Sequence, residues 1–239
     1  PQAEVPKKVI IIGAGPAGCE AAITAKKCGH DVTIYEKRKI GGVLKEATVS
    51  DSKEDLGYLI TYYETQLKKE GIEVIYEEAT ADTVAAGGFD VAIVACGATV
   101  RNLNIDGQDD PSVVYAMDFL DNDCKSDADR VVVVGGGIVG AETALILAEE
   151  QGKDVTITTR SPEFFVPGVM GIAYMVRLGM AGVTIKPSTQ LVAVKDGKPM
   201  FAGPRGLETL DVDQTIISSG FVPTFNQFRA QIEEKCEDV

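Results

Sequence analysis

A glycine-rich turn and one carboxylate near the start of this 239-residue chain are suited to binding a nucleotide. The turn reads Gly13-Ala-Gly15-Pro-Ala-Gly18 and follows a run of β-branched residues. In a G-x-G-x-x-G turn, the first glycine permits a tight bend, the second lets the backbone approach a pyrophosphate, and the third packs the helix on the strand. Free helix-terminal amides then favour phosphate. Glu36 ends the next predicted strand, where a carboxylate accepts hydrogen bonds from a ribose. Together these residues predict a dinucleotide site.

A second turn, Gly135-Gly-Gly137-Ile-Val-Gly140, repeats the pattern with a different ribose position. Thr159 stands where the first copy has Glu36, and Arg160 follows it. A guanidinium with neighbouring hydroxyls suits a 2′-phosphate, which favours NADPH over NADH at this site. The alternative is that Arg160 is a solvated loop residue, which leaves NADH open.

Both turns lie inside strand–helix–strand units. The apolar runs 9–12 and 131–134 predict central strands of parallel sheets covered on both faces, and Asp-Val-Thr-Ile resumes a strand after each helix. Further strands are predicted at 89–96 and 213–218, followed by Gly97 and Gly220. The fold class is therefore α/β, with two Rossmann-like three-layer domains.

Composition limits the partners. Thirty-six acidic against 23 basic residues give a net charge of −13, which disfavours nucleic acid and anionic membranes. The sequence shows no apolar run of about 18 residues and no signal peptide, so we expect a cytoplasmic protein without a membrane span. The five cysteines have no C-x-x-C or metal-ligand spacing, which predicts reduced thiols and no metal. No catalytic side chains are expected, because bound cofactors would supply the chemistry.

Two such turns in tandem resemble the two-dinucleotide-binding flavoproteins of the glutathione reductase type, in which an NAD(P) domain is inserted in an FAD domain. The segment Glu36-Lys-Arg-Lys-Ile-Gly-Gly42-Val-Leu is similar to the C-terminal half of the 2,4-dienoyl-CoA reductase / trimethylamine dehydrogenase family, which are old-yellow-enzyme-like NADH:flavin oxidoreductases. The segments from Asp90 and Gln214 resemble this family as well. The resemblance implies an FAD domain at 1–104 and 222–239, a crossover linker at 105–128 and an NAD(P) domain at 129–221.

The resemblance also implies which residues touch each cofactor. FAD would contact Gly13, Gly15, Pro16, Ala17, Gly18, Glu36, Lys37, Gly42, Val43 and Leu44, with Ala79 at the adenine and Gly97 near the pyrophosphate. The nicotinamide nucleotide would contact Gly137, Ile138, Val139, Gly140, Glu142, Thr159, Arg160 and Gly220. For Glu142, a helix-surface carboxylate is the alternative interpretation.

In that family an N-terminal barrel carries FMN, a 4Fe–4S cluster and the substrate site, while this half takes hydride from NAD(P)H onto FAD. The chain would thus be an electron-input module that works with the barrel of its parent protein, and a homo-oligomer of the parent is compatible with this. It opens without methionine and ends before a Gly-Asp segment that meets the flavin in the family, so we expect a fragment with an incomplete FAD domain and no full turnover alone. The alternative functions are a non-catalytic module that binds ADP or FAD, and the small subunit of a glutamate-synthase-type enzyme.

Overall fold

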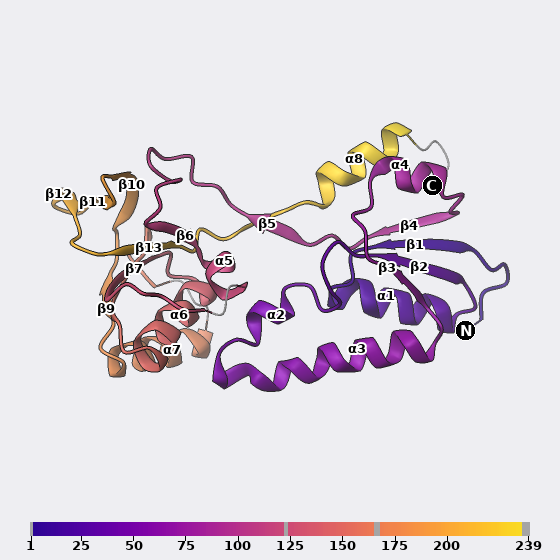
Figure 1. Ribbon diagram of the computed structural model, residues 1–239, viewed down its shortest axis with the longest axis horizontal. Helices are drawn as coiled ribbons and strands as arrows, with labels where there is room; N and C mark the ends of the chain where they lie inside the picture. The colour runs from indigo at the N-terminus through magenta and orange to yellow at the C-terminus, as the bar shows by residue number, and fades with distance from the viewer. Residues whose placement is uncertain (1, 122–123, 165–167, 236–239) are drawn as a thin grey trace. The chain divides into compact units, whose positions relative to one another are not determined.

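The computed structural model describes residues 2–121, 124–164 and 168–235, which form two compact units (Figure 1). The first unit comprises residues 1–99 and 222–239, and the second comprises residues 100–221. The chain leaves the first unit through β5 (Ala98–Val100) and returns through β14 (Phe221–Pro223), and these two strands pair. The second unit is therefore inserted in the sequence of the first.

The first unit is a parallel sheet between two layers of helices (Figure 1). Its strands, in spatial order, are β3 (Glu73–Ile75), β2 (Asp31–Tyr35), β1 (Lys8–Ile12) and β4 (Val91–Val94). Its helices are α1 (Pro16–Lys27), α2 (Leu44–Ala47), the 3-10 helix η1 (Asp51–Leu56), α3 (Gly57–Lys69), α4 (Ala81–Ala86) and α8 (Phe225–Lys235). Successive residues of a strand point to opposite faces, so Val9 and Ile11 pack towards α1 and α3, while Ile10 and Ile12 pack towards α4 and α8.

The second unit has a five-stranded parallel sheet with helices on one face and a small antiparallel sheet on the other. Its parallel strands, in spatial order, are β6 (Val113–Tyr115), β13 (Gln214–Ile217), β7 (Arg130–Val134), β8 (Asp154–Thr158) and β9 (Thr184–Lys186). The helices are α5 (Ala116–Asp121), α6 (Ile138–Leu145), its π-helical continuation η2 (Ile146–Glu150) and α7 (Gly168–Met180). The antiparallel strands are β10 (Gln190–Lys195), β11 (Lys198–Gly203) and β12 (Gly206–Thr209). The segment 105–128, which the sequence indicated as a crossover linker, contains β6 and α5.

The two units repeat the same connection between strand and turn. The Gly13 amide donates to the Tyr35 carbonyl at 2.8 Å, and the Gly135 amide donates to the Thr158 carbonyl at 2.9 Å. Each bond ties the start of a glycine-rich turn to the end of the neighbouring parallel strand. The α/β fold with two parallel sheets, predicted from the tandem motif, is confirmed.

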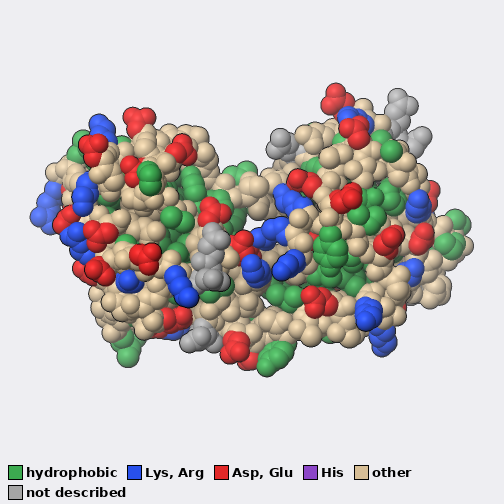
Figure 2. Space-filling view, in the orientation of Figure 1, with side chains coloured by type: hydrophobic (Ala, Val, Ile, Leu, Met, Phe, Trp, Pro, Cys, Tyr) green, Lys and Arg blue, Asp and Glu red, His purple; other side chains and the backbone are tan. Residues whose placement is uncertain are grey.

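Surface charges of both signs are interspersed over the face of the molecule in Figure 2. Among the described residues, no helix combines the length and the apolar character needed to cross a membrane.

The reactivity of the Cys19 thiol tests whether this residue is buried in the core of the first unit. Its Sγ donates to the Ala14 carbonyl at 3.2 Å, and burial, aided by the nearby Glu36 and Glu20 carboxylates, raises its pKa to about 12. At pH 8 the thiolate fraction is then about one in ten thousand, and the thiolate is the reactive form. In the native protein we expect iodoacetamide to spare Cys19 and to modify the partly exposed Cys28, as read by peptide mass mapping. Equal labelling of the two thiols before denaturation would contradict this burial.

Candidate functional site

The first glycine-rich turn holds α1 close to the end of β1 and leaves its N-terminus open. Gly13 has φ +102°, and a Cβ there would lie 2.5 Å from the Ala95 carbonyl oxygen. A Cβ on Gly18 would lie 1.9 Å from the Gly13 carbonyl oxygen, so the helix rests directly on the turn. Gly15 is the N-cap, without a side-chain cap, and a Cβ there would meet only Gly42 Cα at 4.0 Å. The helix amides beyond Gly15 therefore face room for an anion.

Glu36 is fixed beside this turn by two backbone amides. Its Oε2 accepts a hydrogen bond from the Ala14 amide and its Oε1 accepts one from the Arg38 amide, each at 2.7 Å. The residue is only 7 % exposed. A carboxylate offers about four acceptor positions, so the group can still accept from a hydroxyl. The structure thus places the predicted ribose acid at the turn.

The segment after Glu36 folds back against the same turn. The Gly41 amide donates to the Ala14 carbonyl at 2.8 Å, and a Cβ on Gly42 would lie 3.0 Å from Gly15 Cα. Val43 and Leu44 follow at the start of α2. This brings the predicted residues 42–44 to the turn, as expected for a shared ligand.

An ion pair that the sequence did not reveal anchors this segment. The Arg38 guanidinium donates to the buried Glu46 carboxylate at 2.5 Å. Lys37 beside it pairs instead with Glu78 at 3.0 Å on the surface. Arg38 lies in the loop after β2 and Glu46 in α2, so the two residues belong to different segments and no periodic pattern predicts that they pair.

The two remaining predicted FAD residues differ in exposure. Ala79 is buried with Ile10 and Ile12 on the α4 side of the sheet. Gly97 follows β4 with φ +70°, and no atom lies within 4 Å of a Cβ built on it. Gly97 therefore lies at an open position at the carboxyl end of the sheet, whereas the Ala79 side chain belongs to the core.

The second glycine-rich turn has the same backbone contacts as the first, but a different residue, Thr159, stands at the ribose position. A Cβ on Gly140 would lie 1.9 Å from the Gly135 carbonyl oxygen, while a Cβ on the N-cap Gly137 would meet nothing within 4 Å. The buried Thr159 lies beside Gly136, whose Cβ would stand 3.0 Å from Thr159 Cβ. Arg160 is exposed. Among the described residues, the Gly136 amide has no acceptor, whereas its counterpart Ala14 is bonded to Glu36.

A cavity of about 290 Å³ adjoins the second turn. Its lining includes Ile138 and Val139 of α6, and Ser218, Gly220 and Phe221 after β13. The cavity lies at the carboxyl ends of β7 and β13, where the strand order reverses, because β8 lies on the other side of β7. Ligands of doubly wound sheets bind at such a point. The structure therefore brings together four of the predicted residues, Gly137, Ile138, Val139 and Gly220, around one pocket.

Glu142 lies one turn further along α6 and is held by a residue that sequence analysis missed. The Tyr174 hydroxyl on α7 donates a hydrogen bond to the Glu142 carboxylate. Burial raises the pKa of Tyr174, and the bond to Glu142 raises it further. The two residues are far apart in the sequence, and only the packing of α7 on α6 brings them together.

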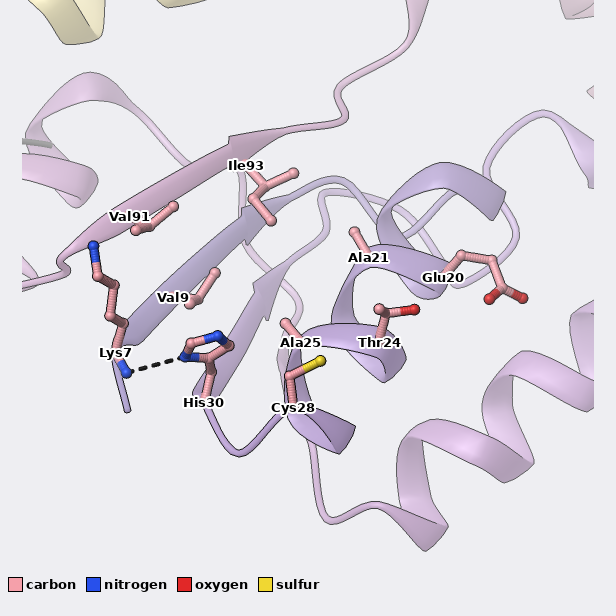
Figure 3. Close-up of a pocket in the computed structure, with 10 residues that line it drawn as sticks. All are labelled: Lys7, Val9, Glu20, Ala21, Thr24, Ala25, Cys28, His30, Val91 and Ile93. Carbon is pink, nitrogen blue, oxygen red and sulfur yellow. Dashed lines mark hydrogen bonds between the residues drawn. The ribbon is translucent and has the colours of Figure 1, made fainter. Parts of the chain in front are cut away.

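A larger cavity of about 480 Å³ in the first unit lies away from the glycine-rich turn (Figure 3). It is lined by α1 residues between Glu20 and Ala25 and by residues at the amino ends of the strands, including Lys7 and His30. The His30 Nδ1 accepts a hydrogen bond from the Lys7 amide at 3.1 Å, which ties down the turn before β2. In the second unit, α5 packs on α6 and β13 at the corresponding place. Because dinucleotides bind at the carboxyl ends of the strands, this cavity is not part of the candidate site.

Two parallel sheets, each with an open glycine-rich turn at its carboxyl edge, define a module that binds two dinucleotides. The family model described as pyridine nucleotide-disulphide oxidoreductase matches residues 7–237. The chain belongs to the pyridine nucleotide-disulphide oxidoreductase family. FAD and a nicotinamide nucleotide are the cofactors that this membership and the relatives indicate.

Several relatives are larger oxidoreductases. An NADH oxidase from Thermoanaerobacter brockii is 33% identical over 253 residues, which is 100% of this chain and 38% of that protein. A cinnamate reductase from Clostridium sporogenes is 40% identical over 158 residues, or 65% of this chain and 23% of that protein. The chain thus spans well under half of the length of these two relatives.

Solved structures of larger oxidoreductases also match the chain. A 2-naphthoyl-CoA reductase in complex with 2-naphthoyl-CoA has a TM-score of 0.86 and 30% identity, and the match covers 97% of this chain and 35% of that chain. Histamine dehydrogenase from Rhizobium sp. 4-9 has a TM-score of 0.82 at 22% identity, over 100% of this chain and 39% of that chain, and shows the fold alone. The predicted resemblance to the FAD/NAD(P)-binding half of the dienoyl-CoA reductase / trimethylamine dehydrogenase family is confirmed. A non-catalytic nucleotide-binding module is not favoured by these relatives.

Proposed function

We propose that this chain is the electron-input module of a larger flavin oxidoreductase, with FAD held by the first unit and a nicotinamide nucleotide by the second. The observation that carries the proposal is the pair of open helix N-termini at Gly15 and Gly137, of which the first is accompanied by an anchored ribose acid, Glu36. Hydride transfer is the chemistry that the two cofactors supply when bound.

The roles of the residues follow from their places. At the first site, the α1 amides bind phosphate, Glu36 orients a ribose, and Gly42 closes the turn from the other side. At the second site, the α6 amides bind phosphate, while Ile138, Val139 and Gly220 shape an apolar pocket. The FAD domain would comprise 1–104 and 222–239, the NAD(P) domain 129–221, and residues 105–128 the crossover between them.

The whole protein would add a further redox part, with FMN and a 4Fe–4S cluster in a separate barrel. The names of two relatives, cinnamate reductase and 2-naphthoyl-CoA reductase, suggest an unsaturated or aromatic acyl compound as the substrate class. The substrate site would then lie in that part and not in this chain.

The colour of the purified protein tests the proposal most directly. We expect the chain to be yellow, or to become yellow with added FAD, and to lose its flavin absorbance when mixed anaerobically with NADPH or NADH. Protein that remains colourless with excess FAD would contradict FAD binding by the first unit. Flavin that neither nucleotide bleaches would contradict the electron-input role.

Arg160 is expected to favour NADPH. The Gly136 amide, which has no acceptor among the described residues, the Thr159 hydroxyl and the exposed Arg160 guanidinium can together hold a 2′-phosphate. Position 159 does not offer the carboxylate that Glu36 offers to a ribose at the first site. We expect Arg160→Glu to lower the ratio of NADPH to NADH affinity by roughly 10- to 100-fold, since charge-assisted hydrogen bonds contribute about 1.5–3 kcal/mol. Titration of both nucleotides measures it, with the exposed Arg205→Glu as the control. An unchanged ratio would leave Arg160 a solvated loop residue.

A further inference from the structure

An aromatic ring packs on the second glycine-rich turn, on the side of β8. Phe164 lies five residues after Thr159, in the loop that follows β8. A Cβ built on Gly136 would lie 3.1 Å from Cδ2 and 3.3 Å from Cε2 of the Phe164 ring. The same Cβ would lie 3.0 Å from Thr159 Cβ. The ring therefore lies against the backbone of the turn, directly beside the residue at the ribose position.

The first unit has the opposite arrangement of small and large residues at these two positions. The residue after the first glycine of the turn is Ala14 in the first unit and Gly136 in the second. Five residues after the ribose position, the first unit has Gly41 and the second has Phe164. In the first unit this segment meets the turn through the Gly41 amide, which donates to the Ala14 carbonyl at 2.8 Å. In the second unit an aromatic side chain meets the turn, and the glycine at position 136 leaves room for it.

The start of the loop that carries Phe164 is fixed by backbone hydrogen bonds. The Thr189 amide donates to the Thr159 carbonyl at 2.8 Å, and the Ser188 amide donates to the Ser161 carbonyl at 3.0 Å. Both donors lie in the turn between β9 and β10. Because this part of the loop is already held in place, a ligand that contacts it need not order it first.

A dinucleotide bound at this turn has one base on the β8 side. Its phosphates lie at the helix N-terminus beside Gly137, and the ribose of one half lies where β8 ends, at Thr159. The cavity of about 290 Å³ adjoins the turn on the other side, towards β13. The base attached to the ribose at Thr159 therefore meets the loop after β8 and not that cavity.

We propose that Phe164 binds the adenine ring of the nucleotide at the second site by stacking. The proposal rests on the proposed function, because it requires an adenine nucleotide at this turn. Phe164 is only partly buried, so part of its ring remains accessible after packing on Gly136. Bases stack on aromatic side chains through their π-faces, and such a contact adds affinity without any charge.

Stacking has a different consequence for nucleotide choice from the one expected of Arg160. NADP⁺ and NAD⁺ carry the same adenine ring and differ only in the 2′-phosphate. Loss of the Phe164 ring should therefore weaken both nucleotides by the same factor, whereas Arg160→Glu changes the ratio of their affinities. Nicotinamide mononucleotide, which lacks adenine, should bind the Phe164 variants as it binds the parent chain.

Calorimetric titration of the full chain with NADP⁺ and NAD⁺ tests the proposal. Phe164→Ala should lower both affinities by roughly 5- to 150-fold, the range for the loss of one base–aromatic stack. Phe164→Tyr keeps the aromatic ring and should bind like the parent chain. Phe164→Leu fills much of the same space without a π-face, so it should melt near the parent temperature and yet bind almost as weakly as Phe164→Ala. The matched control is Phe225→Ala on α8 of the first unit, where an exposed phenylalanine is removed.

Fluorescence gives a second readout that is local to this position. The chain has no tryptophan, so Phe164→Trp introduces a single indole. Addition of ADP should quench its emission through stacking, whereas nicotinamide mononucleotide should not. Tyr58→Trp on α3 of the first unit, at a position that is 74% exposed, is the control and should respond to neither.

The possible failures separate this proposal from the function on which it rests. Equal affinity of folded Phe164→Ala and the parent chain for NADP⁺ would overturn the role of Phe164 and leave the proposed function intact. Full recovery of affinity in Phe164→Leu would do the same, because the ring would then only fill space on the turn. A loss that extends equally to nicotinamide mononucleotide would show that the variant had moved the turn. A parent chain that binds no adenine nucleotide would overturn both this proposal and the nicotinamide-nucleotide site.

Discussion

Replacing Gly137 by valine is expected to weaken nicotinamide-nucleotide binding about 100-fold while leaving the chain folded. Gly137 has φ −83° and ψ −179°, which any residue adopts, and no atom lies within 4 Å of a Cβ built there. The fold therefore tolerates the side chain. Its methyl groups would fill the space at the N-terminus of α6 where a phosphate must approach the amides. Two charge-assisted hydrogen bonds at about 1.5 kcal/mol each amount to roughly a 100-fold loss of affinity.

Calorimetric titration with NADPH and a thermal melt measure the two effects separately. For Gly137→Val we expect a melting temperature close to that of the parent chain and nucleotide binding reduced about 100-fold. Gly140→Ala is the contrasting variant, because its Cβ would lie 1.9 Å from the Gly135 carbonyl oxygen and force α6 off the turn. It should lose both binding and stability. A Gly137→Val chain that binds NADPH normally would contradict the placement of the nucleotide.

The central strands, the glycine-rich turns and Glu36 could be predicted from the sequence because each depends on residues close together in the chain. The runs 9–12 and 131–134 are apolar on both faces and become the central strands β1 and β7. The first and third glycines of both turns are required by close backbone contacts, whereas the middle ones, Gly15 and Gly137, leave room for a phosphate. These contacts act over a few residues and are visible in the sequence as a spacing. Glu36 could be placed because it directly follows β2, the strand that neighbours the turn.

Contacts between distant segments account for what the sequence did not predict. Residues 105–128 are rich in turn-forming types, and the composition indicated only a crossover, whereas Val113–Tyr115 forms β6 by pairing with β13 about a hundred residues later. A three-residue strand has too few positions to show a period. The hydrogen bond from Tyr174 to Glu142 likewise depends on how α7 packs on α6.

Replacing Glu36 by alanine is expected to release FAD and to destabilise the first unit. The carboxylate is 7 % exposed and accepts hydrogen bonds from the Ala14 and Arg38 amides, each at 2.7 Å. Alanine leaves both donors without an acceptor, and an unsatisfied buried group costs about 1–3 kcal/mol. We therefore expect a loss of roughly 2–4 kcal/mol in the free energy of unfolding, in addition to the lost ribose contact.

Glu36→Gln separates the structural role of this residue from its role at the cofactor. Glutamine keeps one acceptor oxygen but presents an NH₂ group in place of the second, so it can satisfy one of the two amides and not both. Its stability should fall between those of Glu36→Ala and the parent chain, while FAD affinity drops in both variants. Denaturant unfolding of the apoprotein and FAD titration measure the two quantities, with the exposed Glu73→Ala on β3 as the control. If Glu36→Ala retained FAD at the parent affinity, Glu36 would serve the turn alone, and FAD would not contact it.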